Sequence, residues 1–308
     1  MFSLIVPIFN EEKLIDELVR RTVLAIESFS THYEVIFVDD GSIDKSAEMI
    51  LGHREKNNRI KLLSLSRNFG HQAAYTAGLE YSCGDIVGMM DGDLQDPPEV
   101  LRYMYRKMTE EDLEIVCAKR TGRKGSRKRN LTSHIFHILF RHMGDLNNIE
   151  NFGNFSIMKR IAVDAVLSMK EKVRYLPGLR ALVGFKQGYV EYIRDERYGG
   201  EPKMTITSLF RLAGDAIFSF SRFPIRICLF LGLAGTLVFM GAGIYVLVAK
   251  ITRIAIPGWS STLLSLYFLG SIQLVFLGIL GEYVFRNYKE SQNRPIYFAR
   301  KFYDNNEG

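Results

Sequence analysis

Two long stretches without a charged residue constrain this chain more than any other feature. Residues 227–249 are 23 successive uncharged residues, and residues 262–281 form a second uncharged stretch. At 1.5 Å per residue the first would be about 35 Å long as a helix, enough to cross a hydrocarbon core of about 30 Å. We therefore expect two transmembrane helices, joined by a turn at Pro257-Gly258 with Trp259 at the interface. A pair of buried core helices is the alternative.

Basic residues predict the orientation of these helices, because cytoplasmic flanks carry the excess of Lys and Arg. The loop between the two stretches holds only Lys250 and Arg253, whereas the outer flanks hold more. Both termini should therefore lie in the cytoplasm, in a multi-pass inner-membrane protein. The segment before the first stretch has apolar and polar residues on opposite helical faces, which predicts a helix in the membrane interface or, as the alternative, a soluble core helix. The expected segments are a cytoplasmic domain at 1–204, an interfacial helix at 205–226, a transmembrane hairpin at 227–285 and a basic cytoplasmic tail at 286–308.

The first 204 residues mix charged and apolar residues as a soluble domain does. Apolar, β-rich runs alternate along this part with segments of helical periodicity. Alternation at this spacing predicts a parallel α/β sheet that is covered on both faces. The expected strands are residues 2–9, 33–42, 60–68 and 85–90, and helices are expected at 13–29 and 71–81.

The composition of the chain indicates in which cellular compartment this domain lies and which kinds of partner it binds. The three cysteines are scattered, and the N-terminus lacks the pattern of a signal peptide, so a reducing cytosolic location is expected. The net charge is +6, which suits anionic partners such as a nucleotide, a phosphate or lipid headgroups. Nucleic acid is not expected as a partner. The basic run at 119–130 is either a solvated loop or a loop that attracts lipid phosphate.

Polar residues follow each of the first four expected strands. In parallel sheets these strand ends share one edge, where ligands bind. A dinucleotide fingerprint and a P-loop are both missing, so a glycine cradle does not hold any phosphates. The residues at the strand ends are Asn10, Glu11, Asp39, Asp40, Arg67, Asn68, Asp91 and Asp93.

Asp91 and Asp93 end an apolar run and are followed by Gln95. In an extended chain residues two apart point the same way, so both carboxylates would face one ligand. Carboxylate and amide oxygens suit Mg²⁺ or Mn²⁺, which complete their shells with substrate phosphates. The alternative is an acidic turn that caps the next helix, and for Asp96, which precedes Pro97-Pro98, capping is the preferred interpretation.

Four motifs together resemble those of the family 2 glycosyltransferases with a GT-A fold. They are VPIFNEE, VDDGSIDKS, SRNFGHQAAYTAGL and DGDLQDPPEV, and the resemblance runs through both uncharged stretches. It is strongest to the polyprenyl-phosphate glycosyltransferases, such as dolichyl-phosphate mannose synthase and the bactoprenol glucosyltransferases of O-antigen modification. The resemblance implies transfer of a sugar from a nucleotide sugar, with a UDP-sugar favoured and UDP-glucose the first candidate, to undecaprenyl phosphate with inversion. It also implies a homo-oligomer.

The same resemblance implies roles for individual residues. Asp91, Asp93, Arg197 and Lys203 would be catalytic, the last two near phosphates in RYGGEPKMT. Asp93 and Gln95 would hold the Mg²⁺ or Mn²⁺ ion. The donor would be bound by Pro7, Phe9, Glu11, Val38, Asp40, Asp91, Gly92, Asp93 and Arg120.

One segment departs from the pattern of the bactoprenol relatives, which tend to have G-D-F-R-L. This chain has GNFSI, with Asn154 in the acidic position and Ser156 in the arginine position. Asn154 cannot act as a base, but a phosphate monoester acceptor with a second pKa of about 6 is already ionised at pH 7. We therefore expect that no base is needed and that Asn154 contacts a different sugar or acceptor.

Two other functions compete with that of a lipid-linked sugar synthase. A processive polysaccharide synthase would carry a Q-x-x-R-W motif, but the chain's only tryptophan, Trp259, follows a glycine. A non-catalytic membrane assembly subunit is the other alternative, which the intact acidic motif disfavours. His71, His134 and His137 lack the spacing of metal ligands and are expected to have core or surface roles.

Overall fold

The computed structural model describes residues 1–121, 152–172, 174–193 and 258–304, together with single residues and short runs between 230 and 252. The described residues belong to two compact units. Of the described residues, the first unit holds 1–121, 152–172, 174–193 and 295–304, and the second holds those from 230 to 294, so the chain returns to the first unit after the second.

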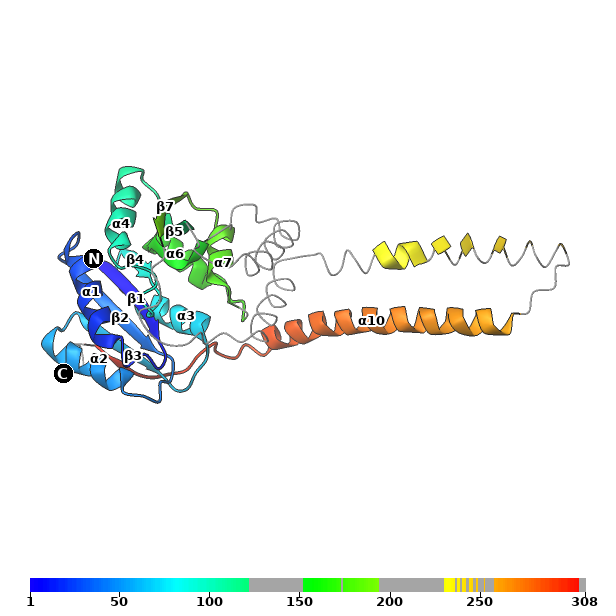
Figure 1. The fold of residues 1–308 in the computed structure, drawn as a ribbon, viewed down its shortest axis with the longest axis horizontal. Coiled ribbons are helices and arrows are strands. Elements are labelled where there is room, and N and C mark those ends of the chain that lie inside the picture. Colours follow the sequence, from blue (N-terminus) through cyan, green and yellow to red (C-terminus); the bar gives the residue numbers. More distant parts are fainter. Residues whose placement is uncertain are drawn as a thin grey trace. The chain divides into compact units, whose positions relative to one another are not determined.

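An eight-stranded sheet forms the centre of the first unit, in the order β7-β5-β6-β4-β1-β2-β3-β8 (Figure 1). The pairs β1–β2, β1–β4, β2–β3 and β5–β7 are parallel. β6 runs antiparallel to both of its neighbours, and β8 runs antiparallel to β3. The strands are β1 (Phe2–Ile8), β2 (Tyr33–Asp39), β3 (Ile60–Leu65), β4 (Ile86–Met89), β5 (Ile115–Thr121), β6 (Phe152–Lys159), β7 (Gln187–Ile193) and β8 (Ala299–Tyr303).

Helices cover both faces of this sheet, which explains why every residue of β1 and β2 is buried. Alternate residues of β1, such as Leu4 and Val6, join a core that includes side chains of α1, α2 and α4. Ile5 points to the opposite face, where it packs against Gly78 of α3. The helices of this unit are α1 (Ile15–Glu27), α2 (Ser46–Lys56), α3 (His71–Tyr81), α4 (Val100–Glu110), α6 (Arg160–Ser168) and α7 (Leu176–Leu182).

The expected sheet is confirmed for its first four strands, and α3 has the bounds that the sequence predicted. The structure differs in the segment 286–308, which was expected to be a separate basic tail. Helix α10 continues to Ser291, and β8 pairs with β3 through Leu62–Tyr303 and its neighbours. Sequence analysis did not predict β8, because the strand is short and carries the charged residues Arg300 and Lys301.

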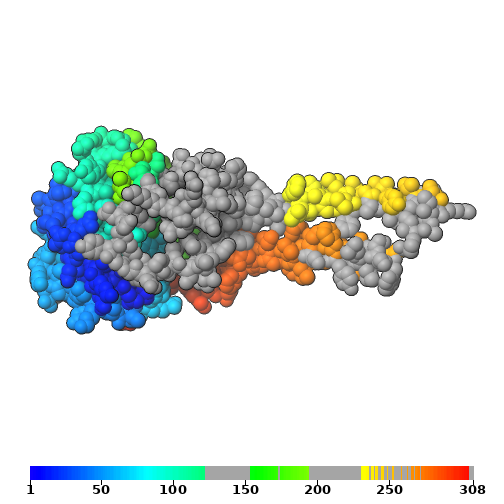
Figure 2. Space-filling view, in the orientation of Figure 1, coloured from blue at the N-terminus to red at the C-terminus, as the bar shows by residue number. Residues whose placement is uncertain are grey.

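The second unit contains α10 (Trp259–Ser291), 33 residues long. Within it, Phe268–Ser291 is long and apolar enough to cross a membrane, and it is the one such helix in the described part of the chain. Its surface carries exposed apolar side chains, including Leu274, Val275 and Leu277. The coloured part of this helix is orange in Figure 2.

The expected span at 262–281 lies inside α10. The other expected span, 227–249, is described only in part, with residues 230–235 helical. The expected interfacial helix at 205–226 lies outside the described residues. The two-helix hairpin therefore stays a prediction.

Candidate functional site

The carboxyl ends of β1, β2 and β4 meet at one edge of the sheet. Ile8 pairs with Asp39, and Ile5 pairs with Met89, so the loops that follow these strands are neighbours. Gly92 confirms this closeness, because a Cβ on it would lie 2.8 Å from the carbonyl oxygen of Pro7. The edge therefore brings together the polar residues that the sequence placed at the strand ends.

Asp91 to Gln95 form a turn and not an extended strand, which differs from the expectation. β4 ends at Met89, and Leu94 has a φ of 57°, which reverses the chain direction locally. Oδ1 of Asp93 accepts a hydrogen bond of 3.1 Å from the N–H of Gln95. The turn, and not alternation along a strand, brings Asp93 and Gln95 together.

Asp91 is the centre of a hydrogen-bonded cluster with the first turns of α3. Its Oδ1 lies 2.9 Å from Nε2 of His71 and accepts a bond of 2.6 Å from the hydroxyl of Tyr75. Burial alone would raise the pKa of Asp91, but the hydrogen bonds from His71 and Tyr75 and the charge of His71 hold it well below its usual range. Burial would lower the pKa of His71, but the bond to Asp91 raises it. The pair therefore favours an imidazolium beside a carboxylate.

Asp40 fixes the loop between β3 and α3. Its two carboxylate oxygens accept hydrogen bonds from the N–H groups of Phe69, at 2.7 Å, and Gly70, at 2.9 Å. Burial raises the pKa of Asp40, and the two N–H donors oppose that rise. Gly41, with a φ of 74°, lies so close to the Arg67–Asn68 peptide that a Cβ would be 2.7 Å from it. Asp40 thus positions the start of α3, which carries the cluster around Asp91.

The other expected donor-binding residues have different surroundings. Val38 is fully buried in the sheet under α3, so its side chain packs in the core and does not face the edge. Pro7 is buried, and Phe9 and Glu11 are partly exposed at the edge. The N–H of Glu11 donates to Oγ of Ser46 at 2.9 Å, which joins this loop to α2.

Asp96 does not cap α4, so the capping interpretation was wrong. The helix begins at Val100, and the fully buried carboxylate of Asp96 instead accepts a bond of 2.5 Å from the hydroxyl of Tyr192. Nε of Arg120 donates to the same hydroxyl at 3.0 Å, and its Nη2 lies 3.6 Å from Asp96 Oδ2. Burial raises the pKa of Tyr192, and the charge of Asp96 adds to the rise. Arg120 is therefore tied to a buried carboxylate and a neutral phenol.

Asn154 is tied to α3 and α7 through Gln72. Nε2 of Gln72 donates to Oδ1 of Asn154 at 3.2 Å, and Oε1 of Gln72 accepts from the N–H of Leu176 at 3.0 Å. On the other side of Asn154, its carbonyl oxygen accepts from Arg180 at 3.0 Å and from the hydroxyl of Ser156 at 2.9 Å. Residue 154 therefore lies where β6, α3 and α7 meet.

Comparison with known proteins identifies the family. The model of glycosyl transferase family 2 matches residues 3–167. An uncharacterized glycosyltransferase of Bacillus subtilis, YkcC, is 38% identical over 305 residues, 98% of this chain and 94% of the relative. The chain belongs to glycosyl transferase family 2.

Two further relatives of this family 2 glycosyltransferase have more specific names. The prophage bactoprenol glucosyl transferase homolog of Escherichia coli is 35% identical over 302 residues, 97% of this chain and 98% of the relative. The SfII prophage-derived bactoprenol glucosyl transferase of Shigella flexneri is 34% identical over 307 residues, 99% of each chain. The solved structure of mannosyl-3-phosphoglycerate synthase from Rubrobacter xylanophilus is more distant, with a TM-score of 0.49 at 18% identity over 70% of this chain and 71% of that one.

Asp93 and Gln95 fit part of a divalent-ion site in this glycosyltransferase. They provide one carboxylate and one amide in a partly exposed turn, and Mg²⁺ often takes one or two carboxylates together with substrate phosphates. Within the described ranges no cluster of three His, Cys, Asp or Glu residues could form a cage made of protein alone. The donor set is therefore of the open kind, which substrate phosphates would complete.

Sequence analysis missed His71, Gln72 and Tyr75, which contact the expected site residues. The available signal was their position, since all three lie in the first turns of a helix that directly follows a strand end. Of the residues with implied roles, Arg197 and Lys203 lie outside the described residues, as do His134, His137 and most of the basic run at 119–130.

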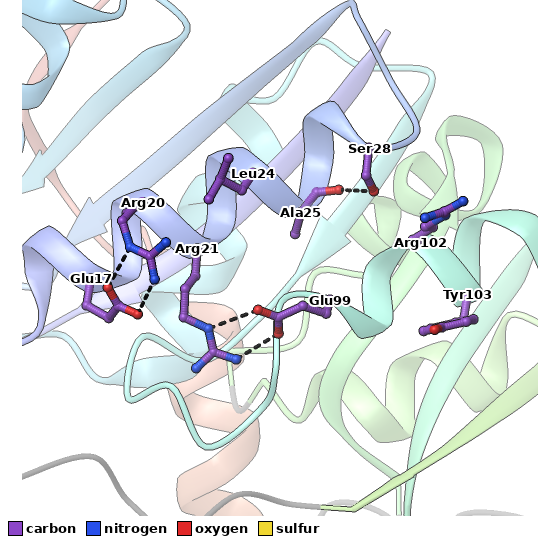
Figure 3. Close-up of a pocket in the computed structure, with 9 residues that line it drawn as sticks. All are labelled: Glu17, Arg20, Arg21, Leu24, Ala25, Ser28, Glu99, Arg102 and Tyr103. Atoms are coloured by element: carbon purple, nitrogen blue, oxygen red, sulfur yellow. Dashed lines mark hydrogen bonds and ion pairs between the residues drawn. The ribbon is translucent and has the colours of Figure 1, made fainter.

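A surface groove of about 510 Å³ is lined by residues of α1 and α4 and of the turns beside them (Figure 3). Two of the arginines in its lining form ion pairs, Arg20 with Glu17 and Arg21 with Glu99, and Arg102 lines it as well. Its lining contains none of the candidate site residues. The groove is therefore separate from the residues that the sequence assigned to the donor.

Proposed function

We propose that this glycosyltransferase moves a sugar from a nucleotide sugar to the phosphate of a membrane polyprenyl phosphate, with inversion at the anomeric carbon. The observation that carries the proposal is the extent of the match to the bactoprenol glucosyl transferases. It covers 97% to 99% of this chain, well beyond residue 167, where the family model ends. The apolar C-terminal part, which suits an acceptor that lies in a membrane, is thus included in the likeness.

The chemistry of the acceptor fits a site without an obvious base. An ionised phosphate oxygen attacks the anomeric carbon, the bond from that carbon to the nucleoside diphosphate breaks, and no proton has to be removed. A bound Mg²⁺ or Mn²⁺, held by Asp93 and Gln95, would neutralise charge that develops on the leaving diphosphate. The chain's own residues orient the substrates: Asp40 fixes the loop before α3, and Asp91 is held ionised to accept from a donor hydroxyl. Arg197 and Lys203 are proposed to bind phosphate.

A UDP-sugar is the proposed donor, with UDP-glucose the first candidate and undecaprenyl phosphate the acceptor. The experiment is incubation of membranes that contain the protein with a panel of labelled nucleotide sugars, followed by lipid extraction. Label from one nucleotide sugar should enter the lipid phase only when a polyprenyl phosphate is present. Label that appears in a long water-soluble polymer, or in no product, would contradict the proposal.

We also propose that the enzyme is a multi-pass protein of the inner membrane, with its catalytic domain and both termini in the cytoplasm, and that it forms a homo-oligomer. The apolar helix α10 and the excess of basic residues outside the two uncharged stretches support this topology. A cysteine placed at Ser260 should react with an impermeant thiol reagent on intact cells, and one at Asn305 should react only after lysis. The reverse pattern would overturn the topology.

A further inference from the structure

The side-chain amide of Gln72 has only one orientation that satisfies its hydrogen bonds. The N–H of Leu176 is a backbone donor, so the atom of Gln72 that lies 3.0 Å from it has to be the oxygen. The amide nitrogen of Gln72 then faces Asn154, at 3.2 Å. The N–H of Leu176, which can only donate, thus determines which end of the Gln72 amide faces Asn154.

The same reasoning fixes the amide of Asn154. Because Gln72 donates to it, the atom of Asn154 on that side is Oδ1, and the Nδ2 group points away from Gln72. In the part of the chain that the structure describes, no group accepts a hydrogen bond from this Nδ2, and Asn154 is partly exposed. On the side away from Gln72, Asn154 therefore offers the two N–H donors of its amide to a ligand.

Arg180 adds a positive charge directly behind this position. Its side chain is 1% exposed, and it donates to the carbonyl oxygens of Gly153, at 2.6 Å, and Asn154, at 3.0 Å, and to the hydroxyl of Ser156. Among the described residues no carboxylate pairs with it, and its Nε is buried without a partner. A buried charge without a counter-ion is costly. An anion bound at Asn154 would supply the missing countercharge.

We propose that Asn154 binds an oxygen of the acceptor phosphate, as a hydrogen-bond donor that Gln72 positions and that the charge of Arg180 supports. This inference rests on the proposed function, and it gives residue 154 a binding role in place of that of a base. The acceptor phosphate is the anion chosen because the other one, the donor diphosphate, is assigned to the turn with Asp93 and Gln95.

The variant Gln72→Glu tests the proposal, because it replaces only the NH₂ group of the side-chain amide by an oxygen. A glutamate at 72 can still accept from the N–H of Leu176, but it cannot donate to Oδ1 of Asn154. The Asn154 amide should then turn, donate to the new carboxylate and present its oxygen to the phosphate. We expect the apparent affinity for farnesyl phosphate, measured by calorimetry on the detergent-solubilised full chain, to fall by about tenfold or more. The KM for the nucleotide sugar should stay nearly unchanged.

Three controls separate this role from a general effect of charge or folding. Asn57→Asp makes the same change from amide to carboxylate, in a side chain that only accepts a hydrogen bond, from the N–H of Arg59, and it should leave acceptor binding unchanged. Asn154→Ala should weaken binding of farnesyl phosphate but not of farnesol, which lacks the anion. In the Asn154→Ala background Gln72→Glu should have little further effect, because the two residues act through one bond.

The outcomes distinguish this inference from the proposed function. Wild-type protein that neither binds farnesyl phosphate nor glycosylates it would overturn both. Normal transfer by wild type, with Gln72→Glu lowering only the melting temperature or weakening only the nucleotide sugar, would overturn the role of Asn154 alone. A rate gain in Asn154→Asp, with a new titration on the acid limb of the pH profile, would show that residue 154 serves best as a base and would also refute it.

Discussion

Gly78 of α3 is the position where a single methyl group should most clearly disturb the site through packing. A Cβ built at Gly78 would lie 2.2 Å from Cγ2 of Ile5 and 3.1 Å from Cγ2 of Val38, where carbon atoms normally keep 3.5 to 4.0 Å apart. Gly78→Ala therefore requires α3 to move away from β1 and β2, or the two side chains to leave their preferred rotamers. Because α3 carries His71 and Gln72, the displacement should also reach the site.

Gly52 of α2 provides the matched control. It is exposed in a helix interior, and nothing lies within 4 Å of a Cβ built on it. Both Gly→Ala changes gain about 1 kcal/mol of helix propensity. Only Gly78→Ala adds an overpacking cost, typically about 1–3 kcal/mol. Gly52→Ala should therefore be more stable than wild type, and Gly78→Ala should lie about 1–3 kcal/mol below Gly52→Ala.

The assay is thermal unfolding of the purified full chain in detergent, followed by circular dichroism, with transfer rates measured below the transition. For a domain of this size 1 kcal/mol corresponds to about 2–4 °C, so the two variants should differ by roughly 2–12 °C. Gly78→Ala should also lower the transfer rate, and Gly52→Ala should not. Equal melting temperatures for the two variants would refute the packing of α3 on β1 that we describe.

Three further predictions concern charge and the C-terminal strand. Asp93→Asn should abolish transfer without lowering the melting temperature, and EDTA should stop wild-type transfer until Mg²⁺ or Mn²⁺ is restored; full activity of Asp93→Asn in chelator would contradict this. Burial alone would lower the pKa of His71, but the bond to Asp91 raises it above the value of about 6.5 in the unfolded chain. The stability that this pair contributes is therefore complete below about pH 6.5 and is lost as the pH rises through the pKa of His71 in the folded protein. The difference in melting temperature between wild type and His71→Gln should therefore be constant below about pH 6.5 and shrink as the pH rises above it, and a difference that grows with pH would be the wrong sign. Phe298→Ala removes a ring 6.0 Å from Phe69 and should raise the KM for the nucleotide sugar by about twofold to tenfold, whereas Phe302→Ala, on the same segment, should lower only the melting temperature.

The first half of the sheet could be predicted from the sequence because its pattern is local. FSLIVPI and YEVIFVD are uninterrupted apolar runs, and the structure buries every residue in them. The helix at 71–81 follows a strand end and is punctuated by Gly70 and by Ser82-Cys83-Gly84, so its bounds were predicted correctly. The clustering of polar residues at one edge followed from parallel pairing alone.

The contacts inside the site could not be predicted, because they depend on tertiary pairing. Nothing in the spacing of His71 and Asp91 shows that their side chains lie 2.9 Å apart. Asp96 has the local pattern of a helix start, but its carboxylate accepts a hydrogen bond from the hydroxyl of Tyr192, 96 residues later. The orientation of the Asn154 amide depends on the N–H of Leu176, because Gln72 is hydrogen-bonded to both residues.

Strand β8 has a consequence for how the protein is made. Arg300 bonds to the carbonyl of Ser66, which lies 234 residues earlier in the chain. At about 5–20 residues per second, a ribosome needs roughly 10–50 s to synthesise that interval. Throughout this time β3 is an edge strand of the sheet without its partner β8, and α10 is itself made within the interval. Such an edge invites pairing with other chains. Delayed or failed membrane insertion should therefore expose a nascent enzyme to aggregation at β3, and chaperone demand should be greatest before residue 299 is translated.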